Sequence, residues 1–259
     1  MSTYIYGIAA RSHPALPKDM GGIGDPPRPV RILEHGELAA IVSDAPEDLR
    51  PKRRDLLAHQ SVLSEAGAAG SVLPLRFGSL APDDESVVTV LDERADHYEE
   101  RLHALAGRVE YNVKASHDEQ AVLHQVLAEN PELRDMVVAN QRAGGGSYQE
   151  KVELGEQVTN AVRAREESDG VEVRLALERA ADAVSAGPES TGWLANLSFL
   201  VRRDTAEGFL AAVEELRTNQ PHLDLRVHGP LPPYSFVDPA PSEPAAPATS
   251  AASGRRTSE

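Results

Sequence analysis

The sequence predicts an α+β protein of two domains followed by a disordered tail, on three observations. Short apolar runs of strand length alternate with longer helical stretches between residues 3 and 237. The chain has 259 residues, which suits two domains of ordinary size better than one. Residues 238–259 are rich in Pro, Ala, Ser and Thr without an apolar pattern, so they cannot bury enough surface to become ordered.

The first predicted domain covers residues 1–107. Aromatic and β-branched residues predict a strand at 3–10, and two apolar runs around a Gly-containing turn predict a hairpin at 30–42. Pro51 can open a helix that runs to about residue 68, and a further strand is expected at 72–77. Apolar residues at three- and four-residue steps predict one helix over 83–106, which Gly107 closes.

The second predicted domain covers residues 108–237 and has the order of a ferredoxin-like split βαβ fold with a long helical insertion. A strand with one buried face is expected at 109–115. Helical sequence follows to about 140, where Pro131 should divide it, and then from 148 to about 186, with Asp169-Gly170 as a candidate break. Two strands, at 193–203 and 223–228, enclose a last helix, and the first domain is expected to be a related α+β variant.

Composition excludes several function classes. The formal charge of −15 disfavours binding to nucleic acid, because phosphate would repel the chain on average. The absence of cysteine excludes disulfides, zinc-thiolate sites, iron–sulfur clusters and thiol nucleophiles. No apolar stretch approaches the length of a membrane span, and no leader is evident, so a soluble cytoplasmic protein with no membrane contact is expected.

No catalytic, cofactor-binding or metal-binding constellation is apparent. The nine histidines include no pair at the spacing of a helical zinc site, so scattered surface histidines are expected. The Gly-rich stretch at 143–151 lacks the Gly-Lys-Ser/Thr of a phosphate loop. The chain is therefore expected not to be an enzyme. Two alternatives stay open: a ferredoxin-like regulatory module that binds a small metabolite, and a cofactor-free enzyme using Glu65 or Glu110.

Arg76 lies within the apolar stretch "VLPLRFGSL" at 72–80. A buried charge needs a partner, so a structural interpretation has Arg76 tie the strand end and its turn to the helix that begins near Asp83. A functional interpretation makes it an anion or partner contact. We favour the structural interpretation from the sequence.

Several stretches together resemble the gas vesicle protein F/L family (GvpF/GvpL). They are "YIYGI" at 4–8, "GELAAIVSDAP" at 36–46, "HQSVLSEA" and "VLPLRFGSL" within 59–80, "VEYNVKA" at 109–115, "GGGSYQEK" at 144–151 and "GPLPPYSF" at 229–236. Two of these stretches contain motifs that are specific to the family. They are Leu-Pro-Leu-Arg-Phe-Gly, within "VLPLRFGSL", and Gly-Pro-x-Pro-Pro-Tyr-Ser-Phe, at 229–236. The family usually carries Trp or Gly where this chain has Tyr111 and Asn112. Whether the chain is an F or an L protein stays open.

The resemblance implies a non-enzymatic accessory or minor structural protein of gas vesicle assembly. Its expected partners are the hydrophobic GvpA-type shell protein and other accessory proteins, and its expected location is the gas vesicle and the cytoplasm. No cofactor is implied. The residues expected to contact a partner lie in the two specific motifs: Arg76, Phe77, Pro232, Pro233, Tyr234 and Phe236.

Overall fold

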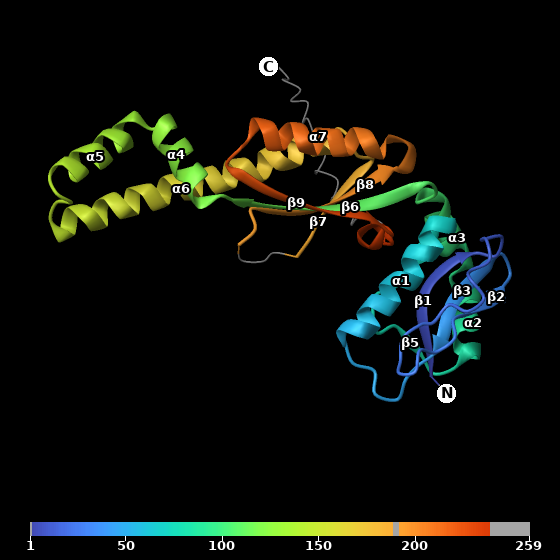
Figure 1. Ribbon diagram of the computed structural model, residues 1–259. Helices are drawn as coiled ribbons and strands as arrows, with labels where there is room; N and C mark the ends of the chain where they lie inside the picture. Colours follow the sequence, from blue (N-terminus) through green and yellow to red (C-terminus); the bar gives the residue numbers. More distant parts are fainter. Residues whose placement is uncertain (1, 189–191, 239–259) are drawn as a thin grey trace, which may run out of the picture.

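The computed structural model describes residues 2–188 and 192–238, so the predicted tail at 238–259 lies outside the described residues except for Asp238. Two antiparallel sheets, each with helices, are built from consecutive parts of the chain (Figure 1). The α+β class, the ferredoxin-like second half and its helical insertion are confirmed. The division at residues 107 and 108 stays a prediction, since the two sheets also share one apolar cluster.

The first sheet has the order β2-β3-β1-β4, with β5 also paired to β1. Its strands and helices are β1 Thr3–Ala10, β2 Arg31–His35, β3 Leu38–Asp44, α1 Arg53–Ala69, β4 Val72–Pro74, β5 Leu80–Ala81, α2 Asp84–Glu93 and α3 Ala95–Ala104. The hairpin at β2 and β3 precedes the first helix, whereas a split βαβ unit has only one strand before its helix. Gly107 follows α3 at φ 68°, a backbone conformation that favours glycine.

An irregularity in β1 changes which face of the first sheet the later residues of the strand point to. The register shifts between Ile5 and Gly7, and this bulge reverses the alternation of side chains along the strand. Tyr4 and Tyr6 therefore pack with α1 on one face, while Ile8 packs with α2 and α3 on the other. The sheet is buried between two helical layers.

The second sheet has the order β7-β8-β6-β9, the strand order of a ferredoxin-like fold. Its elements are β6 Arg108–His117, α4 Glu119–Glu129, α5 Pro131–Arg142, α6 Tyr148–Glu178, β7 Ala183–Ala186, β8 Ala195–Arg202, α7 Ala206–Asn219 and β9 Leu223–Leu231. Helices α6 and α7 cover one face, where Phe199, Phe209 and Leu177 are fully buried. Figure 1 shows both helices on the same side of the sheet.

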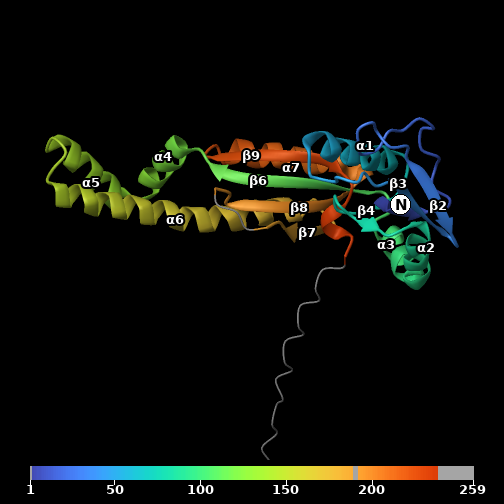
Figure 2. The ribbon, with the colours of Figure 1, turned by 90° about the horizontal axis from the view of Figure 1, so that it is seen from below.

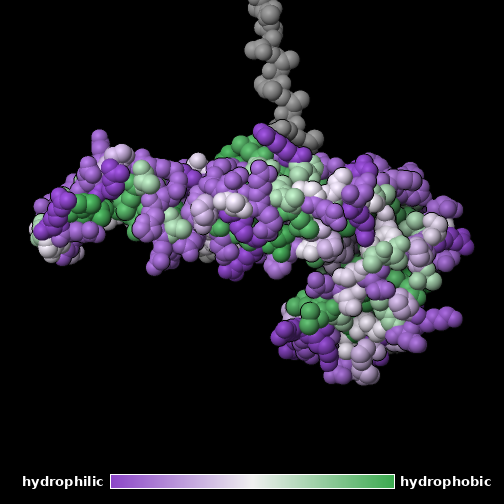
Figure 3. All heavy atoms as spheres, turned by 45° about the horizontal axis from the view of Figure 1, so that its top comes forward, coloured by the Kyte–Doolittle hydropathy of each residue, from purple (hydrophilic) through white to green (hydrophobic). Residues whose placement is uncertain are grey.

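The helical insertion forms an arm that extends away from the two sheets. Helices α4 and α5 pack along the first half of α6, and Figure 2 shows this arm at the end of the molecule opposite the first sheet. Pro131 begins α5, which confirms the predicted division of the helical stretch. On the face shown in Figure 3, hydrophobic side chains lie in separate groups among hydrophilic ones.

Three predictions about where helices end or break are wrong. The helix expected over 83–106 is divided at Arg94, because α2 packs on β2 and β3 whereas α3 packs on β1 and β4. The helix expected to reach residue 186 ends at Glu178, and β7 follows as an edge strand. Helix α6 continues through Asp169-Gly170, where the missing side chain lets the Leu194 carbonyl approach: a Cβ there would lie 3.0 Å from its oxygen.

Candidate functional site

The proline segment, residues 230–237, begins in the last two residues of β9 and packs against the protein's own core. Pro232 and Pro233 are buried, and Phe236 is only 8% exposed. Phe236 belongs to the cluster that joins the two sheets, together with Ile8, Leu73 and others of the first sheet and Leu200 of the second. The segment thus covers the junction of the sheets, and partner binding by its side chains stays a prediction.

Two side chains from other elements hold the backbone of this segment. The carboxylate of Glu110, on β6, is buried; one oxygen accepts a hydrogen bond from the Ser235 amide and the other from its hydroxyl, both at 2.8 Å. Arg101, on α3, donates to the carbonyl oxygens of Phe236 at 2.6 Å and Val237 at 3.0 Å. The segment is therefore fixed by charge-assisted hydrogen bonds from helix α3 and from strand β6.

The two specific motifs meet at one apolar cluster. Phe77 and Tyr234, far apart in the sequence, both pack against the cluster that contains Tyr4, Tyr6 and Val62. Burial raises the pKa of Tyr234 to about 12, so its hydroxyl stays protonated at neutral pH. The structure therefore brings four of the predicted contact residues, Phe77, Pro232, Pro233 and Tyr234, to neighbouring parts of the core.

A cavity lies beside the proline segment. It has a volume of about 330 Å³ and is lined by the end of α1, the Gly107–Val109 stretch, Arg203 and residues 230–233. Arg203 reaches across it to donate a hydrogen bond to the carbonyl oxygen of Gly67. Pro232, Pro233 and Ala68, which is exposed on α1, are among the residues that line the cavity.

Arg76 lies in the turn after β4 and is exposed. The structural interpretation of its side chain is wrong, because β4 ends at Pro74 and the Arg76 guanidinium has no ion pair with any described residue. Asp83 instead caps α2 by accepting from the Ser86 amide at 2.8 Å. The Arg76 carbonyl oxygen accepts from the Ser79 hydroxyl at 2.8 Å, so the backbone, not the charge, organises this turn.

The two carboxylates considered for catalysis differ in their surroundings. Glu65 is exposed on α1 and is not part of any buried polar site. Glu110 is buried, but both of its oxygens are occupied by Ser235. Nothing in either arrangement favours turnover.

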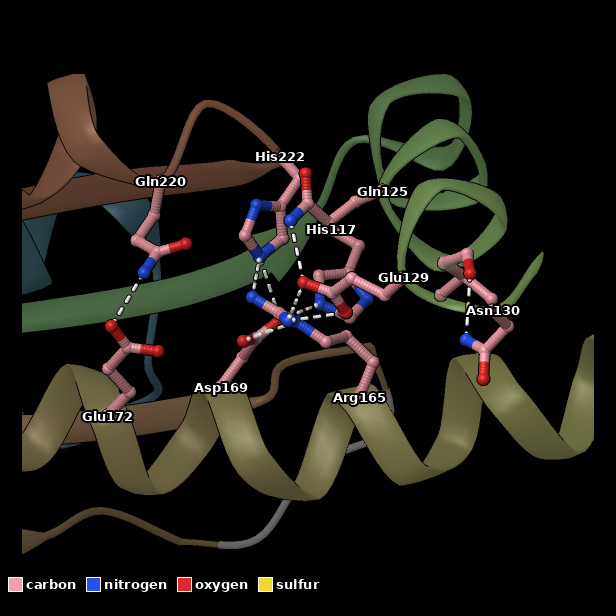
Figure 4. A network of polar contacts seen from close by, with 10 residues as sticks. His117, Gln125, Glu129, Asn130, Arg165, Asp169, Glu172, Gln220 and His222 are labelled. Carbon is pink, nitrogen blue, oxygen red and sulfur yellow. Dashed lines mark hydrogen bonds and ion pairs between the residues drawn. The ribbon is translucent and has the colours of Figure 1, made fainter.

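A second polar cluster lies at the base of the helical arm (Figure 4). The Nε2 atoms of His117, at the end of β6, and His222, before β9, lie 2.8 Å and 2.9 Å from the same oxygen, Oδ2 of Asp169 on α6. The other oxygen, Oδ1, lies 2.9 Å from Nε of Arg165, which also pairs with Glu129 on α4 at 2.7 Å. Burial opposes the charge of Asp169, but the hydrogen bonds from the two histidines and the ion pair with Arg165 outweigh it and lower the pKa of its carboxyl.

The expectation of scattered surface histidines is wrong for this cluster. The side chain of His222 is 2% exposed, that of His117 is 7% exposed, and Asp169 is fully buried. Local spacing could not reveal it, because the three residues come from three elements that the ferredoxin-like fold brings together. The only available signal was an aspartate placed on the apolar face of a helix, four residues before Val173.

A scan against protein-family models matches residues 2–238 to "Gas vesicle synthesis protein GvpL/GvpF". The chain belongs to the GvpL/GvpF family. The gas vesicle protein F of Streptomyces sp. (strain CB03234) is 66% identical over 92% of this chain and 100% of that protein. The gas vesicle protein L of the same strain is 26% identical over 90% of this chain and 92% of that protein.

Solved structures of the GvpL/GvpF family share the fold. The crystal structure of GvpF from Anabaena sp. PCC7120 superposes with a TM-score of 0.71 at 26% identity, covering 92% of this chain and 99% of that one. Membership in the GvpL/GvpF family supports an accessory role in gas vesicles rather than an enzymatic one. No helix among the described residues has both the length and the hydropathy to span a membrane.

Proposed function

We propose that this GvpL/GvpF protein is a non-enzymatic accessory or minor structural protein that binds the hydrophobic GvpA-type shell protein. In this role it supports nucleation or growth of the shell, acts in the cytoplasm and at the gas vesicle, and works beside other accessory proteins. The observation that carries the proposal is the family match over residues 2–238, which spans the whole described fold. The 66% identity to a protein F, against 26% to a protein L of the same strain, favours the F role.

The physical need for such a partner follows from the nature of a shell subunit. A small hydrophobic protein exposes apolar helix faces and strand edges before it polymerises, and these surfaces aggregate. A partner with a net charge of −15 remains dispersed while it covers one of them. Recognition by shape and apolar contact requires no reactive group.

The cavity beside the proline segment supports a specific contact surface. Its wall of Pro232 and Pro233 is rigid, and rigid walls reduce the entropy lost on binding. Its volume of about 330 Å³ suffices for one or two apolar side chains of a partner helix or strand. Tyr234 and Phe236 support that wall from the core side, and the exposed Arg76 offers a polar contact on the turn next to Phe77.

The proposal is tested by co-purification of the full chain with the shell protein after co-expression. The variant Ala68→Trp places a large ring at the cavity from an exposed helix position and should abolish recovery of the shell protein. Ala164→Trp, at an exposed position on α6, is the matched control. Both variants should keep the Tm of the wild type, and equal recovery with both would remove the cavity from the proposal.

The contribution of Arg76 is measured in the same assay. Arg76→Met should leave the Tm unchanged, because the guanidinium makes no ion pair with any described residue. Arg163→Met, an exposed arginine of α6, is its control. Reduced recovery with Arg76→Met alone would support a partner contact, and failure of the wild type to recover any shell protein would overturn the binding proposal as a whole.

A further inference from the structure

We propose that His117, Asp169 and His222 bind one transition-metal ion of the zinc class. Two imidazole nitrogens and one carboxylate oxygen converge from three elements, and these ligand atoms lie within 4.8 Å of one another. Imidazole and carboxylate are ligands that zinc, nickel and cobalt accept. Three protein ligands leave the fourth position of a tetrahedral ion to one water molecule, and the buried surroundings limit competition from further solvent.

The geometry requires only a small expansion to admit an ion. Metal–ligand distances of about 2.0–2.2 Å place the ligand atoms of a tetrahedral zinc about 3.4 Å apart. The present Nε2–Oδ2 separations are 2.8 Å and 2.9 Å, so each ring must withdraw by about half an ångström when its Nε2 proton is replaced by the metal. The Nδ1 atoms of both rings have no hydrogen-bond partner among the described residues, so no hydrogen bond at Nδ1 holds the rings against that withdrawal.

Arg165 contacts Oδ1 of Asp169, the carboxylate oxygen that neither histidine contacts. Its Nε lies against Oδ1, and its Nη1 pairs with Glu129, so Oδ2 remains available as the ligand atom. A metal-binding carboxylate is commonly oriented through its second oxygen in this way. The Nη2 atom lies 3.4 Å from Nε2 of His222 and is the group that must shift toward Glu129 when an ion enters.

The charges of the cluster suit a divalent cation. With both histidines neutral, Asp169, Glu129 and Arg165 carry a formal charge of −1 in a largely buried environment. The ion would join β6, α6 and the start of β9 at one point. Its role would be structural, fixing the base of the arm against the second sheet.

The test uses the full chain after removal of bound metal with a chelator. We expect one equivalent of Zn²⁺ to bind per chain in equilibrium dialysis. At a concentration 100-fold above its Kd, zinc should raise the Tm by about 5–10 °C, given the size of the chain. Co²⁺ should give the visible d–d absorption of a low-coordinate nitrogen and oxygen site. Absence of this absorption and of stoichiometric uptake by the wild type would overturn the proposal, independently of any variant.

Substitutions then assign the ligands. The double variant His117→Gln, His222→Gln should weaken zinc binding by at least 100-fold and remove the zinc-dependent rise in Tm. His124→Gln, at an exposed position on α4, removes a histidine outside the cluster and should bind zinc as the wild type does. Uptake that persists in the double variant would place the metal elsewhere and overturn the assignment.

Discussion

Phe236→Ala tests whether the proline segment is part of the core. Phe236 is 8% exposed, and its ring packs among residues of both sheets, including Ile8 and Leu200. Arg101 holds the backbone carbonyl at 2.6 Å, so the segment cannot collapse into the space that the ring leaves. Removing a buried phenylalanine under these conditions should lower the free energy of unfolding by about 3–4 kcal/mol. For a chain of this size, that loss lowers the Tm by about 6–16 °C.

The assay is thermal unfolding followed by circular dichroism, with urea unfolding as a second measure of the same free energy. Leu57→Ala, on the outer face of α1 with 54% exposure, is the control and should change the free energy of unfolding by less than about 1 kcal/mol. If Phe236→Ala proved as mild as the control, the ring would not belong to the core. Phe236 would then be free to contact a partner directly.

Two further outcomes follow from buried polar groups. Glu110→Gln should lower the free energy of unfolding, measured with urea, by about 1–2 kcal/mol, because an amide replaces the charged acceptor of both Ser235 hydrogen bonds. An unchanged urea midpoint would show that the proline segment is held without this charge. Burial lowers the pKa of His59, although its hydrogen bond to the Leu75 carbonyl opposes this shift. In the unfolded chain, the pKa of His59 is that of an ordinary histidine, about 6.5. Below that pH, His59 binds more protons in the unfolded chain than in the folded chain. The stabilisation from neutral His59 is therefore present above that pH and lost as pH falls below it, and His59→Gln should flatten the dependence of Tm on pH between 5 and 7.

Local sequence patterns correctly predicted a helix or strand where residues within that element determine its type and its ends. Alternation predicted the β6 strand, because its apolar residues face α6 and α7 while Asn112 and Lys114 lie half-buried on the other face. Pro131 divided α4 from α5, since proline cannot donate the helical hydrogen bond. The same reasoning failed at Arg94, where no breaking residue is present and the helix divides to follow different strands.

The candidate sites illustrate the same limit. The motifs containing Arg76 and the proline segment are visible in the sequence, but neither shows which side chains face the core. Arg76 is exposed because β4 ends two residues before it, and Phe236 is buried because two sheets meet over it. The histidine cluster could not be predicted, because its residues lie 52 and 53 positions apart and meet only through tertiary packing.

The sequence alone determined the α+β class, the ferredoxin-like order of the second half, the acidic charge and the resemblance to the GvpL/GvpF family. These depend on periodicity, composition and short motifs, all of which are local. Tertiary structure alone decided which polar and aromatic groups are buried and which meet. Burial depends on the elements that pack over a residue, and those elements come from distant parts of the chain.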